Sequence, residues 1–404
     1  MIELVKTSTP SLASARLLLV ILAVSLALPG AARADFASCL AAIRSEAVHS
    51  GIPGSVFDQA TAGVQPDMKI LDLQKNQPEF KTPIWDYLAG LVDDERIADG
   101  KEGLRKYARA FALAEERYGV PRTIIAAVWG VESNFGKTMG SRPLIQSLAT
   151  LGCYGERAGY FRGELIATLK IVAHGDIAAD RLVGSWAGAF GQTQFMPSTF
   201  LRLAVDLDGD GRRDIVDSVP DAIGSTANFL HHAGWRSGIG WGFEVKLPEG
   251  YSGPSGRRRK APMSAWAARG IRRVDGRPLG EGEAGLLLPA GPNGPAFLVT
   301  SNFDAIYSYN AAESYALAIA HLSDRLAGGG PFVTPWPTDD PGLSRAERRE
   351  LQRLLTQRGY DVGEPDGAIG NKTREAIADF QRKIGRSPDG RPSAKVLAAL
   401  RQGM

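Results

Sequence analysis

A glycine- and proline-rich run near residue 330 divides the sequence into two parts that must fold separately. It begins with Gly328–Gly330 and continues through Pro331–Pro341. This composition favours neither helix nor strand and is typical of linkers. We therefore expect a large domain over residues 35–327, a linker over 328–342 and a small domain over 343–404. The chain has 404 residues, which is enough for two or three domains of roughly 100–200 residues each.

The N-terminus has the three features of a secretory signal peptide. Lys6 and Arg16 supply positive charge, Leu17–Leu28 form an apolar run, and Ala32–Ala34 offer a small-residue cleavage site. A membrane anchor is the alternative, but the apolar run is 12 residues long, whereas a spanning helix needs about 20. We expect residues 1–34 to be a cleavable signal peptide and the mature protein to be periplasmic.

The overall composition is ordinary for a globular protein and excludes two classes of function. Hydrophobic residues make up 44% and charged residues 23%, and the net charge is only +3. So small a charge indicates neither a nucleic-acid binder nor an acidic scaffold. We expect a monomer with no nucleic-acid partner and no organic cofactor.

The chain contains two cysteines, Cys39 and Cys153, and both follow the expected signal peptide. A disulfide between them is favoured in an oxidising compartment. Lipid attachment at Cys39 is the alternative, since residues 36–39 faintly resemble a lipid-attachment motif, although they lie well beyond the apolar run.

From Phe36 to about Arg325 the apolar spacing is mainly helical. Pro121 opens a helix whose residues 124–129 are apolar nearly all round, so it should be buried. The texture changes from Gly242 to about Val299, where Gly and Pro separate short apolar runs. We expect a small strand-containing insertion there, with strands over Phe243–Leu247, Gly285–Leu288 and Ala296–Thr300. A basic run inside it, Arg257–Lys260, is interpreted as a solvated loop, with contact to an anionic polymer as the alternative.

Two stretches of the large domain carry candidate chemistry. In Gly130–Gly136 the apolar helix ends at Glu132, a carboxyl group whose burial should raise its pKa. A raised pKa suits a general acid that protonates a glycosidic oxygen near neutral pH. A solvated or salt-bridged glutamate is the alternative. The second stretch, Gly188–Ser198, combines small residues with Gln192 and Gln194, whose amides suit hydrogen bonds to a sugar. A tight turn before the next helix is its alternative.

In this order, the two stretches resemble the membrane-bound lytic transglycosylase B family, glycoside hydrolase family 103. Glu132-Ser133 stands where the family has its catalytic Glu-Ser or Glu-Thr, and Gly188–Ser198 resembles its Gly-Ala-Met-Gly-Gln-Thr-Gln-Phe-Met-Pro signature, with Phe190 in place of Met. Further segments are similar to the connecting and C-terminal blocks of the family: Ser147–Leu151, Tyr160–Leu165, Asn302-Phe303, Tyr309-Asn310 and Tyr315–Leu317.

The resemblance implies a mainly α chain with a lysozyme-like α+β catalytic domain and cleavage of the MurNAc-GlcNAc β-1,4 bond of peptidoglycan. Glu132 would be the only catalytic acid/base, and the muramic acid 6-hydroxyl would attack its own anomeric carbon to give a 1,6-anhydro end. The implied substrate-binding residues are Ser133, Gln192, Gln194, Phe195, Tyr309 and Asn310. The alternatives are a muramidase that uses water and a non-catalytic periplasmic protein that binds the cell wall.

The segment Asp206–Asp217 matches a calcium-binding EF-hand loop. Acids stand at positions 1, 3, 5, 9 and 12 and a glycine at position 6. It departs from the pattern at position 12, where Asp replaces the longer Glu, and Asp221 is an alternative ligand. We expect a structural calcium ion, against the alternative of a solvated acidic turn, with the ligand residues Asp206, Asp208, Asp210, Arg212, Asp217 and Asp221.

The last 60 or so residues resemble the three-helix peptidoglycan-binding domain common in cell-wall hydrolases. Gly359-Tyr360, Asp366-Gly367 and Pro388–Gly390 separate the three helical segments. Leu351, Leu355 and Phe380 are expected in its core. Such a module would attach the enzyme peripherally to the cell wall and raise its concentration at the glycan strands.

Overall fold

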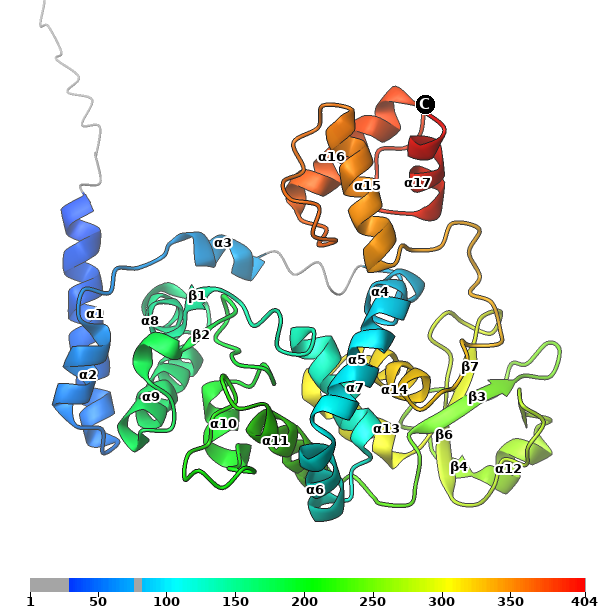
Figure 1. The fold of residues 1–404 in the computed structure, drawn as a ribbon, viewed down its shortest axis with the longest axis horizontal. Helices are drawn as coiled ribbons and strands as arrows, with labels where there is room; N and C mark the ends of the chain where they lie inside the picture. The colour runs from blue at the N-terminus through cyan, green and yellow to red at the C-terminus, as the bar shows by residue number, and fades with distance from the viewer. Residues whose placement is uncertain (1–28, 76–81, 404) are drawn as a thin grey trace, which may run out of the picture.

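The computed structural model describes residues 29–75 and 82–403, which form a large helical body and a small C-terminal domain (Figure 1). The helices of the large body are α1 Pro29–His49, α2 Gly54–Thr61, α3 Lys69–Lys75, α4 Ile84–Leu91, α5 Asp94–Lys106, α6 Ala108–Tyr118, α7 Arg122–Ser133, α8 Leu144–Tyr154, α9 Ala158–His174, α10 Pro197–Leu203, α11 Val219–His232, α12 Met263–Ala268, α13 Ser301–Asn310 and α14 Glu313–Leu326. The described part of the small domain has the helices α15 Arg345–Gln357, α16 Asn371–Lys383 and α17 Ala394–Arg401. The predicted mainly α fold class is confirmed.

Helix α7 runs through the centre of the large body. Residues 124–130 are all buried, and the helix packs against α5, α6, α11 and α14. The burial follows from the sequence because these residues are apolar on every side of the helix. The C-terminal end of α7 brings Glu132 to the edge of this core.

A five-stranded antiparallel sheet forms from the segment between α11 and α13, in the order β4-β6-β7-β3-β5. Leu298 of the central strand lies opposite both Phe243 and Leu286. The predicted strand-containing insertion is therefore confirmed. The strands are β3 Gly242–Lys246, β4 Ala261–Pro262, β5 Arg272–Arg273, β6 Glu283–Leu287 and β7 Ala296–Val299, while β1 Arg142–Pro143 and β2 Val183–Gly184 form a separate pair.

The basic run in this insertion is not the fully solvated loop that the sequence predicts. Arg257 is 8% exposed, and its guanidinium lies 2.6 Å from the Asp304 carboxylate and 3.6 Å from the Tyr307 ring centroid. The Lys260 ammonium also pairs with Asp304, at 2.8 Å. Two of the four charges are thus neutralised within the protein by a carboxylate distant in sequence.

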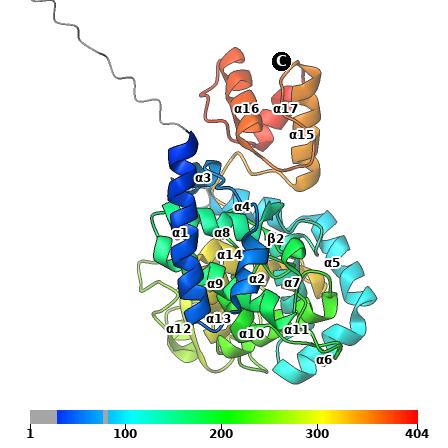
Figure 2. The same cartoon turned by 90° about the vertical axis from the view of Figure 1, so that its left-hand side faces the viewer.

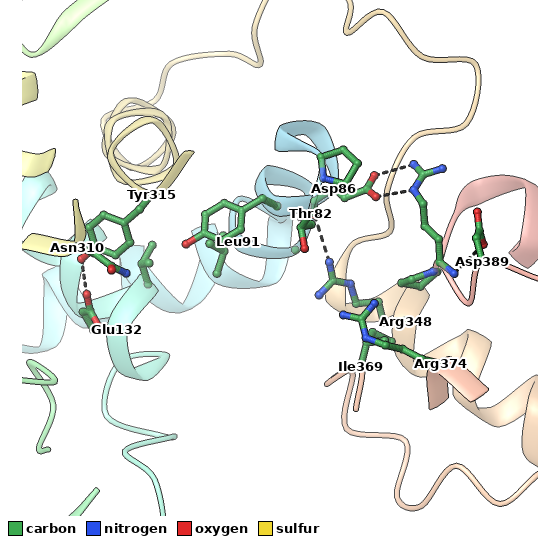
Figure 3. A pocket seen from close by; sticks show the side chains of 16 residues that line it. Thr82, Asp86, Leu91, Glu132, Asn310, Tyr315, Arg348, Ile369, Arg374 and Asp389 are labelled. Atoms are coloured by element: carbon green, nitrogen blue, oxygen red, sulfur yellow. Dashed lines mark hydrogen bonds and ion pairs between the residues drawn. The ribbon is translucent and has the colours of Figure 1, made fainter. Parts of the chain in front are cut away.

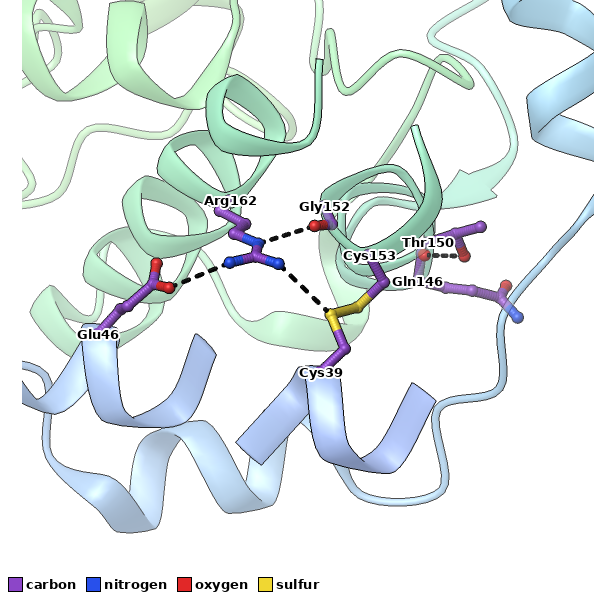
Figure 4. The surroundings of a disulfide bond; sticks show 7 residues. All are labelled: Cys39, Glu46, Gln146, Thr150, Gly152, Cys153 and Arg162. Atoms are coloured by element: carbon purple, nitrogen blue, oxygen red, sulfur yellow. Dashed lines mark hydrogen bonds and ion pairs between the residues drawn. A yellow bond between two sulfur atoms is a disulfide. The ribbon is translucent and has the colours of Figure 1, made fainter. Parts of the chain in front are cut away.

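Helices α1, α2, α8, α9 and α10 surround a second core. Cys39 and Cys153 form a disulfide that joins α1 to α8, and Arg162 of α9 donates a 2.8 Å hydrogen bond to the Gly152 oxygen beside it (Figure 4). With its sulfur bonded, Cys39 has no thiol to carry the alternative lipid. The expected signal peptide lies outside the described residues up to residue 28, and residues 29–34 belong to α1. None of the helices in the described part of the chain is long and apolar enough to cross a membrane.

The linker over residues 328–342 is held against the large body, which its composition does not indicate. The Phe332 ring stacks on His321 with centroids 3.8 Å apart. The amides of Val333 and Thr334 each donate a 2.7 Å hydrogen bond to the carboxylate of Glu244. Both overall views show the C-terminal domain seated over the end of α4 (Figures 1 and 2). The C-terminal domain therefore has a defined position on the large body.

Candidate active site

The chain reverses direction directly after the end of α7. Asn134 and Phe135 both adopt positive φ angles, 50° and 59°, so the chain folds back immediately after Ser133. The Phe135 ring then lies over Gly130, where a β-carbon would stand only 2.6 Å from a ring carbon. Glycine at position 130 is thus a steric requirement of the fold at this point.

A buried tyrosine holds the Glu132 carboxyl group. Tyr315 on α14 is 2% exposed, and its hydroxyl donates a hydrogen bond to Glu132 Oε1 (Figure 3). Burial raises the pKa of Glu132 from its ordinary 4.5 to about 7, and the hydrogen bond from Tyr315 lowers it in part. The carboxyl group therefore retains its proton to near neutral pH and remains able to accept it back.

The second sequence motif packs directly against the end of α7. Trp129 Nε1 donates a 2.9 Å hydrogen bond to Gln192 Oε1, and Gln192 Nε2 donates one of 3.0 Å to the Val216 oxygen. Ser133 Oγ donates to the main-chain oxygen of Gln192 at 2.8 Å. These bonds fix the position of the motif relative to Glu132.

The turn after Gln192 brings Gln194 beside the tyrosine of α13. Gln194 has a φ of 50°, a sparsely populated conformation for a residue other than glycine. Its side-chain nitrogen Nε2 donates a 2.8 Å hydrogen bond to the Gly191 oxygen, which stabilises this turn. The Tyr309 hydroxyl donates to the Thr193 oxygen, also at 2.8 Å. The turn is thereby tied to the helix that carries Tyr309.

Two cavities meet at Glu132. One, of about 860 Å³, is lined by the second motif and by α13 and α14, and it includes Trp186, Gln194, Tyr309 and Asn310. The other, of about 730 Å³, extends from Glu132 and Tyr315 past α4 to the C-terminal domain (Figure 3). Because Glu132 lines both, an extended polymer has room on either side of the acid.

The predicted substrate-binding residues divide into two groups. Three of them line these cavities: Gln194, Tyr309 and Asn310. The other three are buried at 1%, 5% and 2% exposure and line neither cavity: Ser133, Gln192 and Phe195. Direct substrate contact by this second group stays a prediction, and the contacts that the structure provides for them lie within the protein.

Tyr315 is a site residue to which sequence reasoning assigned no function. Its hydroxyl is polar and nearly inaccessible, and Tyr315 begins a buried run of α14 whose next five residues, 316–320, are apolar. A lone phenol within such a helix indicates a specific hydrogen-bond partner, and this was the available signal.

The acidic loop brings together three of the predicted metal ligands. Asp206, Asp208 and Asp210 present carboxylate oxygens within 4.8 Å of one another. The loop is preformed, because Asp206 accepts hydrogen bonds from the Gly209 amide at 2.6 Å and the Gly211 amide at 2.8 Å. Three carboxylates held this close repel one another unless a hard cation lies between them, so the residues fit calcium.

The other predicted ligands are engaged elsewhere. The Asp217 carboxylate pairs with Arg181 at 2.5 Å. Asp221 is fully buried and accepts 2.8 Å hydrogen bonds from the amides of Leu207 and Asp214. Asp221 therefore shapes the loop. The Arg212 side chain forms an ion pair with Asp210 at 3.1 Å.

Comparison with known proteins agrees with this geometry. The sequence profile of the transglycosylase SLT domain matches residues 35–324, and that of a peptidoglycan binding domain matches residues 344–400. Membrane-bound lytic murein transglycosylase B of Escherichia coli strain K12 is 33% identical over 274 residues, 64% of this chain and 73% of that protein.

Two solved structures are similar over most of their length. SltB3 from Pseudomonas aeruginosa, in complex with NAG-anhNAM-pentapeptide, is 46% identical with a TM-score of 0.73, covering 91% of this chain and 99% of that one. The Escherichia coli lytic transglycosylase Slt35, in complex with calcium, is 31% identical with a TM-score of 0.64, covering 72% and 92%. The chain therefore belongs to the transglycosylase SLT domain family and is a peptidoglycan lytic transglycosylase with a C-terminal peptidoglycan-binding domain.

Proposed function

We propose that the enzyme cleaves the MurNAc-GlcNAc β-1,4 bond without water and leaves 1,6-anhydro-MurNAc ends, with Glu132 as the only acid/base. The observation that carries this proposal is a single carboxyl group at the junction of two cavities, with a pKa of about 7. Among the described residues, the side chain that contacts it is a tyrosine and not a second carboxylate.

One carboxyl group is sufficient if the substrate supplies its own nucleophile. Protonated Glu132 gives its proton to the glycosidic oxygen as the bond from that oxygen to the anomeric carbon breaks. The 6-hydroxyl oxygen of the same muramic acid then bonds to the anomeric carbon, and Glu132 takes the hydroxyl proton. The enzyme returns to its starting state and no water is consumed. The hydrogen bond from Tyr315 stabilises the intermediate carboxylate.

Hydrolysis by a muramidase requires a second acid or base. The cavity of about 730 Å³ is also lined by Asp86 and Asp389, which are bound by Arg391 and Gln381. The cavity of about 860 Å³ contains one other carboxylate in its described lining, that of Glu313. It is an exposed group, paired with Arg257 at 3.6 Å. Glu313 is therefore the residue to test for the hydrolytic alternative.

The decisive experiment is digestion of purified sacculi, with mass spectrometry of the released muropeptides. We expect products lighter by one water than the hydrolytic ones, their complete loss in Glu132→Gln, and their persistence in the matched control Glu313→Gln. Reducing ends that disappear in both variants would instead identify a hydrolase. Digestion by Glu132→Gln at the parent rate would overturn the proposal.

We further propose that the protein is exported, acts in the periplasm and carries a structural calcium ion. Export is supported by the charge and apolar run of residues 1–34. Calcium is supported by the carboxylates of Asp206, Asp208 and Asp210 and by the calcium complex of the related Slt35. The ion would hold the segment between α10 and α11, away from the bond that is broken.

A further inference from the structure

The cavity that leads from Glu132 to the C-terminal domain belongs to both domains. Its catalytic side includes Glu132 and Tyr315, and its far side is formed by Arg348, Ile369 and Arg374 of the C-terminal domain (Figure 3). At about 730 Å³, its size is within the usual range of ligand sites, roughly 300–1,000 Å³.

The shape of this cavity is held by an ion pair between the two domains at its rim. Arg391 of the C-terminal domain holds both oxygens of Asp86 on α4, at 2.6 and 2.8 Å. The Asp86 carboxylate is 9% exposed, so this bidentate pair is shielded from water and salt. Gly342 packs against the same residue, where a β-carbon would lie 2.6 Å from its Cα. The far wall of the cavity is thus held in register with Glu132.

The carboxylates near the far wall form their direct bonds with other partners than Arg348 and Arg374. Asp86 and Asp340 neutralise Arg391, and the Asp389 carboxylate accepts a 2.7 Å hydrogen bond from Gln381. Arg348 donates only to main-chain oxygens, those of Leu343 at 3.0 Å and Asp86 at 3.3 Å.

Arg374 is exposed on the same wall. Within residues 29–75 and 82–403, no carboxylate forms an ion pair with Arg348 or Arg374. Burial lowers the pKa of Arg348, the carboxylates of Asp86 and Asp93 raise it in part, and the charge of Arg374 lowers it. Two guanidinium groups therefore line the cavity with no carboxylate of the described residues bonded to them, an arrangement that favours an anionic ligand.

We infer that Arg348 and Arg374 bind carboxylates of the peptide stem carried by the glycan strand that Glu132 cleaves. The inference rests on the proposed function, because it requires a strand that passes Glu132 and continues to the C-terminal domain. A sugar backbone is neutral and would need hydroxyl or amide partners, whereas a peptide stem ends in a carboxylate. Guanidinium groups bind carboxylates in planar, two-point geometry. The C-terminal domain then contributes directly to substrate selection.

Arg374→Ala is the first test, because an exposed side chain without a bonded partner can be removed without disturbing the domain contact. Arg353→Ala is the matched control, since Arg353 is exposed on the same domain and lies outside the cavity. Each full-length variant is assayed on peptide-bearing glycan strands and on the same strands after the stem carboxylates have been converted to neutral amides. Melting temperatures verify that the variants are folded.

We expect Arg374→Ala to raise KM on peptide-bearing strands about tenfold, the effect of one lost charge-assisted hydrogen bond. The kcat on those strands, and both constants on the strands with amidated stems, should stay close to the parent values. Arg374→Lys should recover part of the loss and Arg353→Ala should show none.

An equal rise in KM on both substrates, or the same rise in Arg353→Ala, would indicate nonspecific electrostatic attraction between the domain and the strand. Either result would overturn the inference. An unchanged KM in Arg374→Ala would overturn it as well. Failure of the parent protein to release anhydro products from either substrate would count against the proposed function instead.

Discussion

The Ser133 hydroxyl donates a 2.8 Å hydrogen bond to the main-chain oxygen of Gln192 and accepts one of 3.0 Å from the Gly136 amide. One buried hydroxyl thereby joins the end of the catalytic helix, the turn that follows it and the second sequence motif. The residue next to Glu132 thus has a positioning function in this structure.

Ser133→Ala should destabilise the protein and impair catalysis. The substitution leaves the Gly136 amide and the Gln192 oxygen without their partner, at a cost of about 1–3 kcal/mol. Urea unfolding measures this loss, and kcat on peptidoglycan should fall more than KM changes. Ser133→Thr retains the hydroxyl and should keep most of the activity. Unchanged unfolding and unchanged kcat in the alanine variant would contradict this positioning function.

The rate should depend on pH through the protonation of Glu132. With its pKa near 7, the acid form predominates below pH 7, and kcat/KM should fall about tenfold per pH unit above it. No fall from a second carboxylate is expected between pH 6 and 5, because the mechanism uses one acid. Measurement of kcat/KM on sacculi over a pH series covers both the range above pH 7 and the range between pH 6 and 5. A bell-shaped profile with an acidic limb near pH 5 would favour the hydrolytic alternative.

The same raised pKa predicts a pH-dependent gain in stability for Glu132→Gln. The native state binds this proton more tightly than the unfolded chain, so its contribution is complete below pH 4.5 and is lost as pH rises through 7. At pH 8.5 the charged, partly buried carboxylate costs about 3 kcal/mol, which the neutral glutamine avoids. The difference in melting temperature between the variant and the parent should therefore be larger at pH 8.5 than at pH 5.

How far the sequence predicts this site depends on how local each feature is. The burial of residues 124–130 and the raised pKa of Glu132 follow from one apolar run, so they can be read directly. The Tyr315 contact joins residues 183 positions apart and depends on how α14 packs on α7. No local pattern encodes that packing.

The same limit explains two departures in the fold. Composition identifies a linker, but its attachment depends on Glu244, a carboxylate distant in sequence that accepts two linker amides. Charge counting treats Arg257 as solvated, because its partner Asp304 lies 47 residues away. The sequence likewise predicts the helices of the C-terminal domain but does not indicate where this domain lies relative to the cavities at Glu132.

Calcium should stabilise the protein through the carboxylates of Asp206, Asp208 and Asp210. At a free concentration 100 times the Kd, a bound ion adds about 2.7 kcal/mol to the free energy of unfolding. Calorimetric melting with calcium and with a chelator measures this difference. Asp208→Asn should abolish most of it, whereas Asp217→Asn, at an exposed pair with Arg181, should keep it. Loss of the calcium effect in Asp217→Asn alone would mean that Asp217 turns from Arg181 to bind the ion.

Arg345 at the start of α15 should couple the C-terminal domain to the catalytic turn. Its guanidinium donates to Asn134 Oδ1 at 2.7 Å and lies 2.9 Å from Asp93, whose side chain is 4% exposed. Arg345→Ala leaves that carboxylate buried and unpaired, which typically costs about 3–5 kcal/mol. It also releases the side chain of Asn134, two residues after Glu132, so kcat should fall together with stability.

Arg349→Ala provides the matched control for this coupling. Arg349 pairs with Glu95 across the same domain contact, but both side chains are partly exposed, and pairs of this kind contribute about 0–1 kcal/mol. Urea unfolding and kcat are measured for Arg345→Ala and Arg349→Ala. A double-mutant cycle with Arg345→Ala, Asp93→Ala and the double variant then isolates the Arg345–Asp93 interaction. The effects of Arg345→Ala and Asp93→Ala could instead be additive, or Arg349→Ala could lose as much stability and kcat as Arg345→Ala. Either result would show that the domain contact as a whole, and not this buried pair, supports the catalytic turn.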